Sequence, residues 1–162
     1  MNLLSAYQKL KSLEPTFLTK DAAAVLEVSA NYAAIILRSL AKQNTIVRLS
    51  RGRWAYSTSV DPLHLPNILS YPMTAYISLY SALYYHGMIE QIPNAIFAMT
   101  NGKTKTFQTP LAKVSLHSIN AVLFTGYESC GANAILMATP EKALFDTLYL
   151  MPENGDERSW LL

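Results

Sequence analysis

The sequence predicts an α+β protein in which a winged helix-turn-helix domain over residues 1–60 precedes a small mixed α/β domain over residues 73–162. Helix-like periodicity followed by a short β-rich hairpin predicts the first domain. Three prolines within the eleven residues from Pro62 to Pro72 place a linker at residues 61–72. The two parts differ in charge: residues 1–60 hold eight Lys and Arg against three acids, and residues 61–162 hold five against eight. A change of sign along a chain indicates nucleic-acid contact by its basic part.

Composition excludes several classes of protein. With 51% hydrophobic and 15% charged residues the chain is expected to fold rather than to remain disordered. No run approaches the roughly 18 apolar residues of a membrane span, and no basic start precedes a long apolar core, so we expect neither a membrane helix nor a signal peptide. A cytoplasmic protein is therefore expected. The single Cys130 can form no internal disulfide and is expected to be a half-buried small residue.

The first domain begins with three predicted helices. Leu3, Leu4, Tyr7 and Leu10 form one apolar stripe on a packing helix that ends before Pro15. Thr19 is expected to cap a second helix over residues 20–27, and Ser29 a third that runs to about Gln43. Two helices joined by so short a turn must cross steeply, which is the helix-turn-helix geometry.

The third of these helices is expected to bury one face and to present the other to a DNA major groove. Its inward stripe consists of Ala33, Ile36, Leu37 and Leu40. On the outward face Asn31 can pair with an adenine edge, Tyr32 can reach phosphate or stack on sugar, and Arg38 can reach guanine or phosphate. An exposed Ile35 is either a contact to a thymine methyl group or a dimer contact, and the sequence favours neither.

A basic hairpin follows. The segment 45–49 is β-rich, Ser50–Arg53 supplies a turn with Gly52, and Trp54–Tyr56 returns as the second strand. A solvated hairpin would show the same basic turn, but its position directly after a helix-turn-helix favours DNA contact. From Val28 to Val60 the chain has five basic residues and no Asp or Glu. The predicted DNA-binding residues are Lys20, Ser29, Asn31, Tyr32, Arg38, Lys42, Arg48, Arg51 and Arg53.

The second domain is expected to combine helices with short strands. Thr74 would cap a helix over residues 75–86 that is apolar on almost every side, and Thr139 and Pro140 would begin a final helix. Because so small a domain cannot cover such a helix, we expect an exposed apolar surface that contacts a second copy of the chain or another protein. Strands are expected at residues 95–100 and 104–108, joined as a hairpin by Asn101-Gly102, and at residues 112–117, 121–125 and 134–138.

The sequence contains no recognisable catalytic or metal-binding constellation. His64, His86 and His117 have no Cys or acid at ligand spacing. Glu141 and Asp146 are five residues apart on the final helix and face different ways, and Lys142 is the expected partner of Asp146. A glycine-rich phosphate loop, a serine nucleophile motif and a nuclease-like acid cluster are all missing. We therefore expect a protein that is not an enzyme and holds no cofactor or metal.

Two segments of the second domain, residues 75–93 and 138–146, resemble the AbiEi antitoxin family. The basic hairpin, Arg48–Trp54, is also similar to that family's R-x-x-R-G-x-Y segment, with Trp54 in place of the usual Tyr. The similarity extends over about residues 16–150. It implies an antitoxin of a type IV toxin–antitoxin system that binds double-stranded operator DNA, represses its own operon and counteracts a nucleotidyltransferase-like toxin. Members of the family usually continue well beyond the helix that contains Asp146, so repression is the safer inference.

Two other functions remain open from sequence. A ligand-responsive transcription regulator would use the aromatic segment from Tyr76 to Tyr85 to line a small-molecule pocket. A nuclease would use the basic domain only for targeting and would need a divalent metal.

Overall fold

The computed structural model describes residues 2–151 and has the predicted mixed α+β composition. The chain divides into two compact units. The first comprises Met1–Leu65 with Phe107–Ala112, and the second comprises Pro66–Thr106 with Lys113–Leu162. The boundary between Leu65 and Pro66 falls inside the expected linker, which contains η2 (Pro62–His64) and α4 (Leu65–Ser70).

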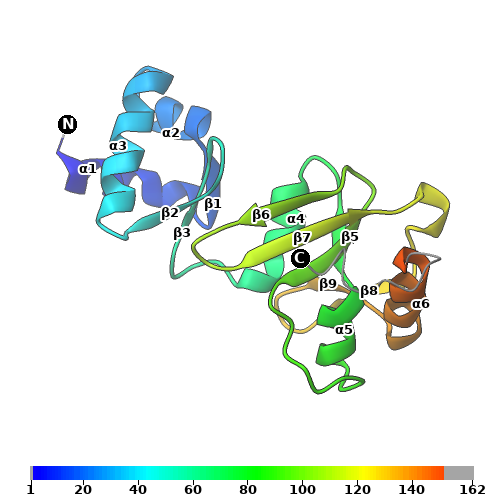
Figure 1. The fold of residues 1–162 in the computed structure, drawn as a ribbon. Coiled ribbons are helices and arrows are strands. Elements are labelled where there is room, and N and C mark those ends of the chain that lie inside the picture. Colours follow the sequence, from blue (N-terminus) through cyan, green and yellow to red (C-terminus); the bar gives the residue numbers. More distant parts are fainter. Residues whose placement is uncertain (1, 152–162) are drawn as a thin grey trace. The chain divides into compact units, whose positions relative to one another are not determined.

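The first unit consists of helices and a three-stranded antiparallel sheet with strand order β1-β3-β2 (Figure 1). Its elements in chain order are α1 (Leu3–Leu10), η1 (Lys11–Leu13), β1 (Thr16–Leu18), α2 (Thr19–Leu26), α3 (Ala30–Lys42), β2 (Ile46–Ser50) and β3 (Arg53–Tyr56). The three α-helices and the hairpin were expected. Strand β1 was not, because three residues between Pro15 and a helix are too few to show a period of two.

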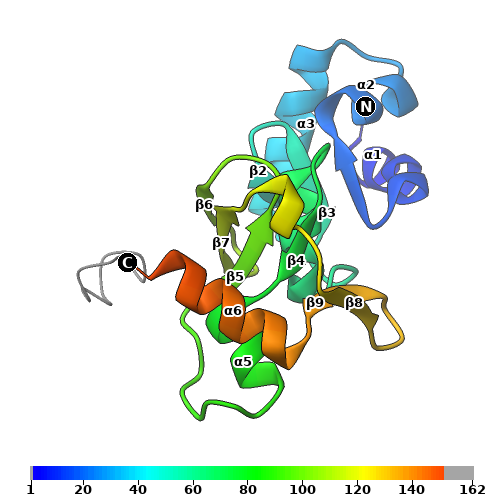
Figure 2. The same ribbon diagram turned by 90° about the vertical axis from the view of Figure 1, so that its right-hand side faces the viewer.

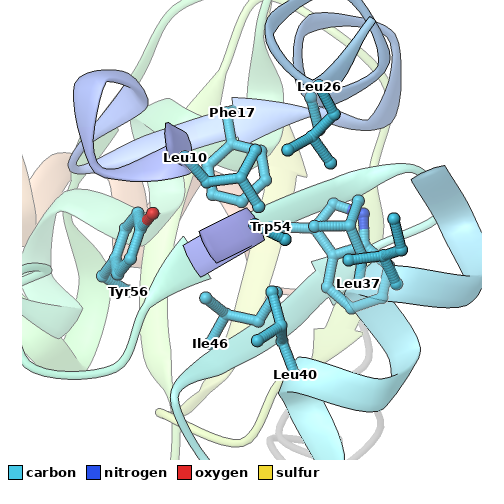
Figure 3. Packing of buried hydrophobic residues seen from close by; sticks show 11 residues of the cluster. Leu10, Phe17, Leu26, Leu37, Leu40, Ile46, Trp54 and Tyr56 are labelled. Atoms are coloured by element: carbon cyan, nitrogen blue, oxygen red, sulfur yellow. The ribbon is translucent and has the colours of Figure 1, made fainter. Parts of the chain in front are cut away.

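One apolar cluster holds the first unit together (Figure 3). The inward stripe of α3 is buried as predicted, and Leu37 and Leu40 pack there with Trp54 of β3. The predicted stripe of α1 is partly wrong, because Leu10 is buried whereas Leu4 is 62% exposed. Tyr56 lies between Tyr7 and Phe17, with ring centroids 5.7 and 5.8 Å away, and burial raises the pKa of its hydroxyl to about 12.

The second unit is built on a six-stranded mixed sheet of order β6-β7-β5-β4-β9-β8 (Figure 2). Strand β4 is antiparallel to β5 and parallel to β9, and β5 is parallel to β7. Helices α5 and α6 lie side by side in both views. The elements are β4 (Ala75–Ile77), α5 (Leu79–Tyr85), β5 (Ile96–Thr100), β6 (Lys105–Gln108), β7 (Lys113–Ser118), η3 (Ala121–Leu123), β8 (Tyr127–Cys130), β9 (Ile135–Ala138) and α6 (Pro140–Leu150).

The prediction of one helix over residues 75–86 was wrong. Ala75–Ile77 form the strand β4, and α5 begins only at Leu79, whose backbone has a φ of +55°. Both faces of β4 are covered, so its residues are all apolar and do not alternate. A short apolar run of this kind cannot be told from a buried helix by periodicity.

Two further expectations for the second unit were wrong, and one strand was missed. Residues 104–108 do not form a hairpin with the strand before them, because β6 lies beside β7. Asn101 instead accepts a hydrogen bond from the backbone N–H of Thr74 at 3.1 Å. Residues 121–125 contain η3, which Asn120 caps, in place of a strand. Strand β8, which pairs with β9, was not expected. The final helix begins as predicted, with Thr139 accepting from the N–H of Lys142.

No single helix among residues 2–151 is long and apolar enough to cross a membrane. Helices α2 and α3 reach that length and composition only as a pair, which bends by 102° at the break between them.

Candidate nucleic-acid interface

The exposed face of α3 has the side chains that the sequence predicts. Asn31, Arg38 and Lys42 are exposed, Tyr32 is 43% exposed and Ile35 is 52% exposed. At 100° per residue these five positions fall within an arc of about 120°, so they share one face of the helix. Ser29 begins α3, and its hydroxyl accepts from the N–H of Tyr32 at 3.3 Å. Its observed role is therefore that of a helix cap.

The connection from α2 to α3 produces the expected steep crossing. The residue after α2 is Glu27, with a φ of +56°, and only Val28 and Ser29 separate it from α3. The helices meet at a bend of 102°. Arg38 and Ser39 bond back to their own helix through Ala34 O and Ile35 O.

The turn of the β2–β3 hairpin is fixed to the start of α2. The N–H of Thr19 donates to Gly52 O at 2.9 Å, and its hydroxyl donates to the same oxygen at 3.3 Å. The indole N–H of Trp54 donates to the Thr19 hydroxyl at 3.0 Å. Gly52 has a φ of +74°, which a side chain would strain. The expected cap role of Thr19 was wrong, because α2 begins at Thr19 itself and Asp21 accepts from Leu18 N–H instead.

The bonds between Thr19 and Gly52 join two segments that contain four of the predicted basic residues. Lys20, next to Thr19, lies near the hairpin turn, where Arg48 and Arg51 are also exposed. Arg53 is half-buried on β3, opposite Leu18. A bulge between Arg48 and Ser50 interrupts the pairing of the hairpin, and the Arg48 Nε–H donates to Ser50 O. The first unit thus has two basic surfaces that phosphate groups can reach, one on α3 and one at the hairpin turn.

A second polar cluster lies inside the second unit. The carboxylate of Asp146, with no exposed surface, accepts hydrogen bonds at Oδ2 from the Tyr76 hydroxyl at 3.0 Å and the Ser78 hydroxyl at 2.7 Å. Lys142 Nζ lies 2.8 Å from Oδ1, as the sequence predicted, and donates to Leu123 O at 2.8 Å. Burial and the carboxylate raise the pKa of Tyr76. The cluster joins β4, η3 and α6, and substrate could not reach its carboxylate.

Sequence reasoning missed the part of Tyr76 and Ser78 in this cluster. Both fell inside the predicted helix 75–86, where they would have faced different directions. The signal that could have located them was the carboxylate itself, because an Asp among large apolar residues needs more than one partner when it is buried.

The side chains of His86 and His117 have structural contacts. His86 Nε2 donates to Ala138 O at 2.8 Å. His117 stacks on Phe97 and lies 3.0 Å from the Ser115 hydroxyl, and burial lowers its pKa. Within the described residues no group of three or more His, Cys, Asp or Glu is placed to hold a metal ion. Cys130 is half-buried, as expected.

A hollow of about 390 Å³ lies beside α5 and the loop after it. Of the aromatic segment from Tyr76 to Tyr85, only Tyr80 lines it. The other lining residues are Ile89, Gln91, Ile92, Pro93, Asn94 and Phe97.

Comparison of the chain with models of protein families finds no matching family, and comparison with curated proteins finds no matching relative.

The Asp146 cluster makes a direct prediction about stability. Asp146→Ala leaves the nearly buried ammonium of Lys142 and two buried hydroxyls without their acceptor, so the free energy of unfolding should fall by about 3 to 5 kcal/mol. Urea denaturation of the full chain measures this. The double variant Lys142→Met/Asp146→Leu should recover part of the loss, because it removes both charges.

The matched control is Glu141→Ala, which removes an exposed carboxylate from the same helix. It should cost less than about 1 kcal/mol. Equal urea midpoints for Asp146→Ala and the unaltered chain would show that the cluster does not stabilise the fold.

Proposed function

We propose that this chain is a DNA-binding antitoxin and the repressor of its own operon, with a winged helix-turn-helix over the first unit. The observation that carries the DNA-binding part is the exposed basic face of α3 together with the basic hairpin turn, in a stretch that has no acidic residue. Phosphate contacts need such a surface, and acids within it would repel the backbone.

The order of elements supports the winged helix-turn-helix. A helix, a short strand, two steeply crossing helices and a two-stranded hairpin follow one another, and the short strand pairs with the hairpin. In this arrangement α3 is the recognition helix, which enters the major groove, and the β2–β3 hairpin is the wing, which follows the backbone beside it. Thr19 keeps the wing at a fixed position relative to α2, so both elements can meet DNA without prior ordering.

The roles of individual residues follow from their positions. Asn31 and Arg38 are proposed to contact base edges, since both are exposed on the outward face of α3 and their side chains can pair with adenine and guanine. Tyr32 is proposed to contact phosphate or sugar. Lys20, Lys42, Arg48, Arg51 and Arg53 are proposed to position the protein on the phosphate backbone.

The antitoxin part of the proposal rests on the resemblance of residues 75–93 and 138–146 to the AbiEi family. These segments form β4 with α5 and the start of α6, which are the elements that the Asp146 cluster joins. A partner toxin of the nucleotidyltransferase class would be encoded beside the gene for this chain.

A ligand-responsive regulator is the second candidate, and the hollow beside α5 is the observation that favours it. Its volume lies in the range of small-molecule sites, and Gln91 and Asn94 supply polar groups. A small molecule that releases the chain from its operator would support this function over the antitoxin.

Changes at the wing should alter the salt dependence of DNA binding. We expect the double variant Arg48→Gln/Arg51→Gln to weaken binding to any duplex and to reduce the slope of log K against log salt by about 0.9 for each lost phosphate contact. Fluorescence anisotropy with a random-sequence duplex at several salt concentrations measures both effects.

Lys103→Gln removes an exposed charge from the second unit and serves as the control, with an unchanged slope expected. If the wing variant keeps the slope of the unaltered chain, the hairpin does not contact DNA.

Changes on the recognition helix should separate sequence reading from phosphate contact. Asn31→Ala is expected to reduce the preference for the operator over random duplex by roughly ten- to hundredfold, because a bidentate contact to adenine is worth about 1 to 3 kcal/mol. Lys42→Gln, on the same face, should weaken binding to both duplexes alike. If Asn31→Ala weakens binding to the operator and to random duplex equally, Asn31 contacts the DNA backbone instead. The DNA upstream of the chain's own gene is the operator to use.

Neutralisation can be tested apart from repression. Co-expression of the chain with the nucleotidyltransferase-like protein encoded beside it should restore growth that the toxin alone arrests. Asn31→Ala should keep this rescue while it loses repression of a reporter under the operon's promoter. A chain that represses the reporter but never restores growth would retain the DNA-binding part of the proposal and remove the antitoxin part.

A further inference from the structure

Helix α6 has the reverse of the usual amphipathic arrangement. It buries Ala143, Asp146 and Thr147, which are small or polar. Its large apolar side chains face outward, with Leu144 and Phe145 each 45% exposed, Leu148 59% and Tyr149 47%. A helix at the surface of a protein ordinarily turns its large apolar residues toward the core. Four of them on the outer face of one helix indicate a surface that another molecule covers.

The side chains of this face are held in place by one another and by the core. The rings of Phe145 and Tyr149 stack, with centroids 6.2 Å apart and an interplanar angle of 19°. Lys142 Nζ lies 4.8 Å from the centre of the Phe145 ring, and Asp146 and Leu123 O fix that ammonium from the other side. Side chains that are already ordered lose little conformational entropy when a partner docks.

Helix α5 packs beside α6 and has exposed apolar side chains of its own. Tyr84 is 41% exposed and Tyr85 55%, and Met88 after the helix is 48% exposed. A large apolar side chain that is half exposed presents on the order of 80 to 100 Å² to solvent, so these seven offer on the order of 600 Å². A stable interface buries about 800 Å² on each partner, of which about 500 Å² is apolar. The surface is therefore large enough for the apolar part of one such interface.

The charges near the surface decide what kind of partner fits it. Along α6, which lies wholly within the described residues, Glu141 is the only exposed charged residue. It stands in the first turn, about 4.5 Å along the axis from Leu144 and about 10 Å from Leu148. The other exposed charge close to the face in sequence is Glu90, two residues after Met88. A two-fold axis that passes near Leu148 would oppose the apolar side chains of α6 and keep each Glu141 away from its copy, as an isologous interface requires.

We propose that the face formed by Leu144, Phe145, Leu148 and Tyr149 of α6, with Tyr84, Tyr85 and Met88 beside it, binds the same face of a second copy of this chain. The inference is independent of DNA binding and of the toxin, since it rests on the second unit alone.

The test is sedimentation velocity of the full chain at 1 to 100 µM. The unaltered chain should form a dimer with a micromolar dissociation constant. Leu144→Glu/Leu148→Glu should raise that constant at least tenfold, because it places carboxylates opposite one another in an apolar interface. Both positions are about half exposed, so the fold should tolerate the change, and circular dichroism checks it. The milder Leu148→Ala should shift the constant in the same direction.

Leu4→Glu is the matched control, since Leu4 is an exposed leucine on α1 of the first unit. It should dimerise as the unaltered chain does. A chain that is monomeric at 100 µM would overturn the proposal and leave the surface to a different occupant. A dimer that survives Leu144→Glu/Leu148→Glu with an unchanged constant would overturn it as well, because another face would then form the interface.

Discussion

The buried carboxylate of Asp146 is the interaction on which the second unit depends. It joins a central strand, a short helical turn and the last helix, because Tyr76, Ser78 and Lys142 all bond to it and Lys142 also bonds to Leu123 O. The cost of removing a carboxylate from water is repaid only when every partner is present. The cluster therefore specifies one position of α6 against the sheet, and through Lys142 it also positions the ring of Phe145 on the outer surface.

Thr19 has the corresponding role in the first unit. It bonds to the hairpin turn at Gly52 O and accepts from Trp54, whose indole is part of the apolar cluster. The backbone N–H and the hydroxyl of Thr19 thus fix the basic turn to α2, beside an indole that belongs to the core. Arginines on a mobile hairpin would lose conformational entropy on binding DNA. A turn that is already fixed by Thr19 would lose less. In both units a polar side chain links a buried core to an exposed surface.

The sequence predicted the first unit better than the second, for physical reasons. Helix α3 has a full amphipathic period over 13 residues, so its buried stripe and its exposed face could both be read directly. The hairpin had a glycine where the turn needs a positive φ. The candidate residues on α3 and the hairpin are exposed or half-exposed as expected, whereas Thr19 has a tertiary role that no local pattern contains. In the second unit, Ala75–Ile77 are buried on both faces and lack any period. Strand β5 has β4 and β7 as its neighbours, so β6 pairs with the strand after it and not with the strand before it. The sequence predicted an exposed apolar surface in the second unit but did not locate it on α6. Which side of a helix is buried depends on the residues of the sheet against which the helix packs.

The parallel pairing of β4 with β9 has a consequence for how the chain is made. Ile77 lies opposite Met137, sixty residues later, whereas every strand of the first unit finds its neighbours within about forty residues. During synthesis the first unit can therefore close while one edge of β4 still waits for its partner. Until β9 leaves the ribosome, one edge of the apolar strand β4 has free backbone groups, which is the condition in which a nascent chain aggregates. Factors that slow elongation before residue 138, or that bind nascent apolar strands, should thus affect the yield of the second unit more than that of the first.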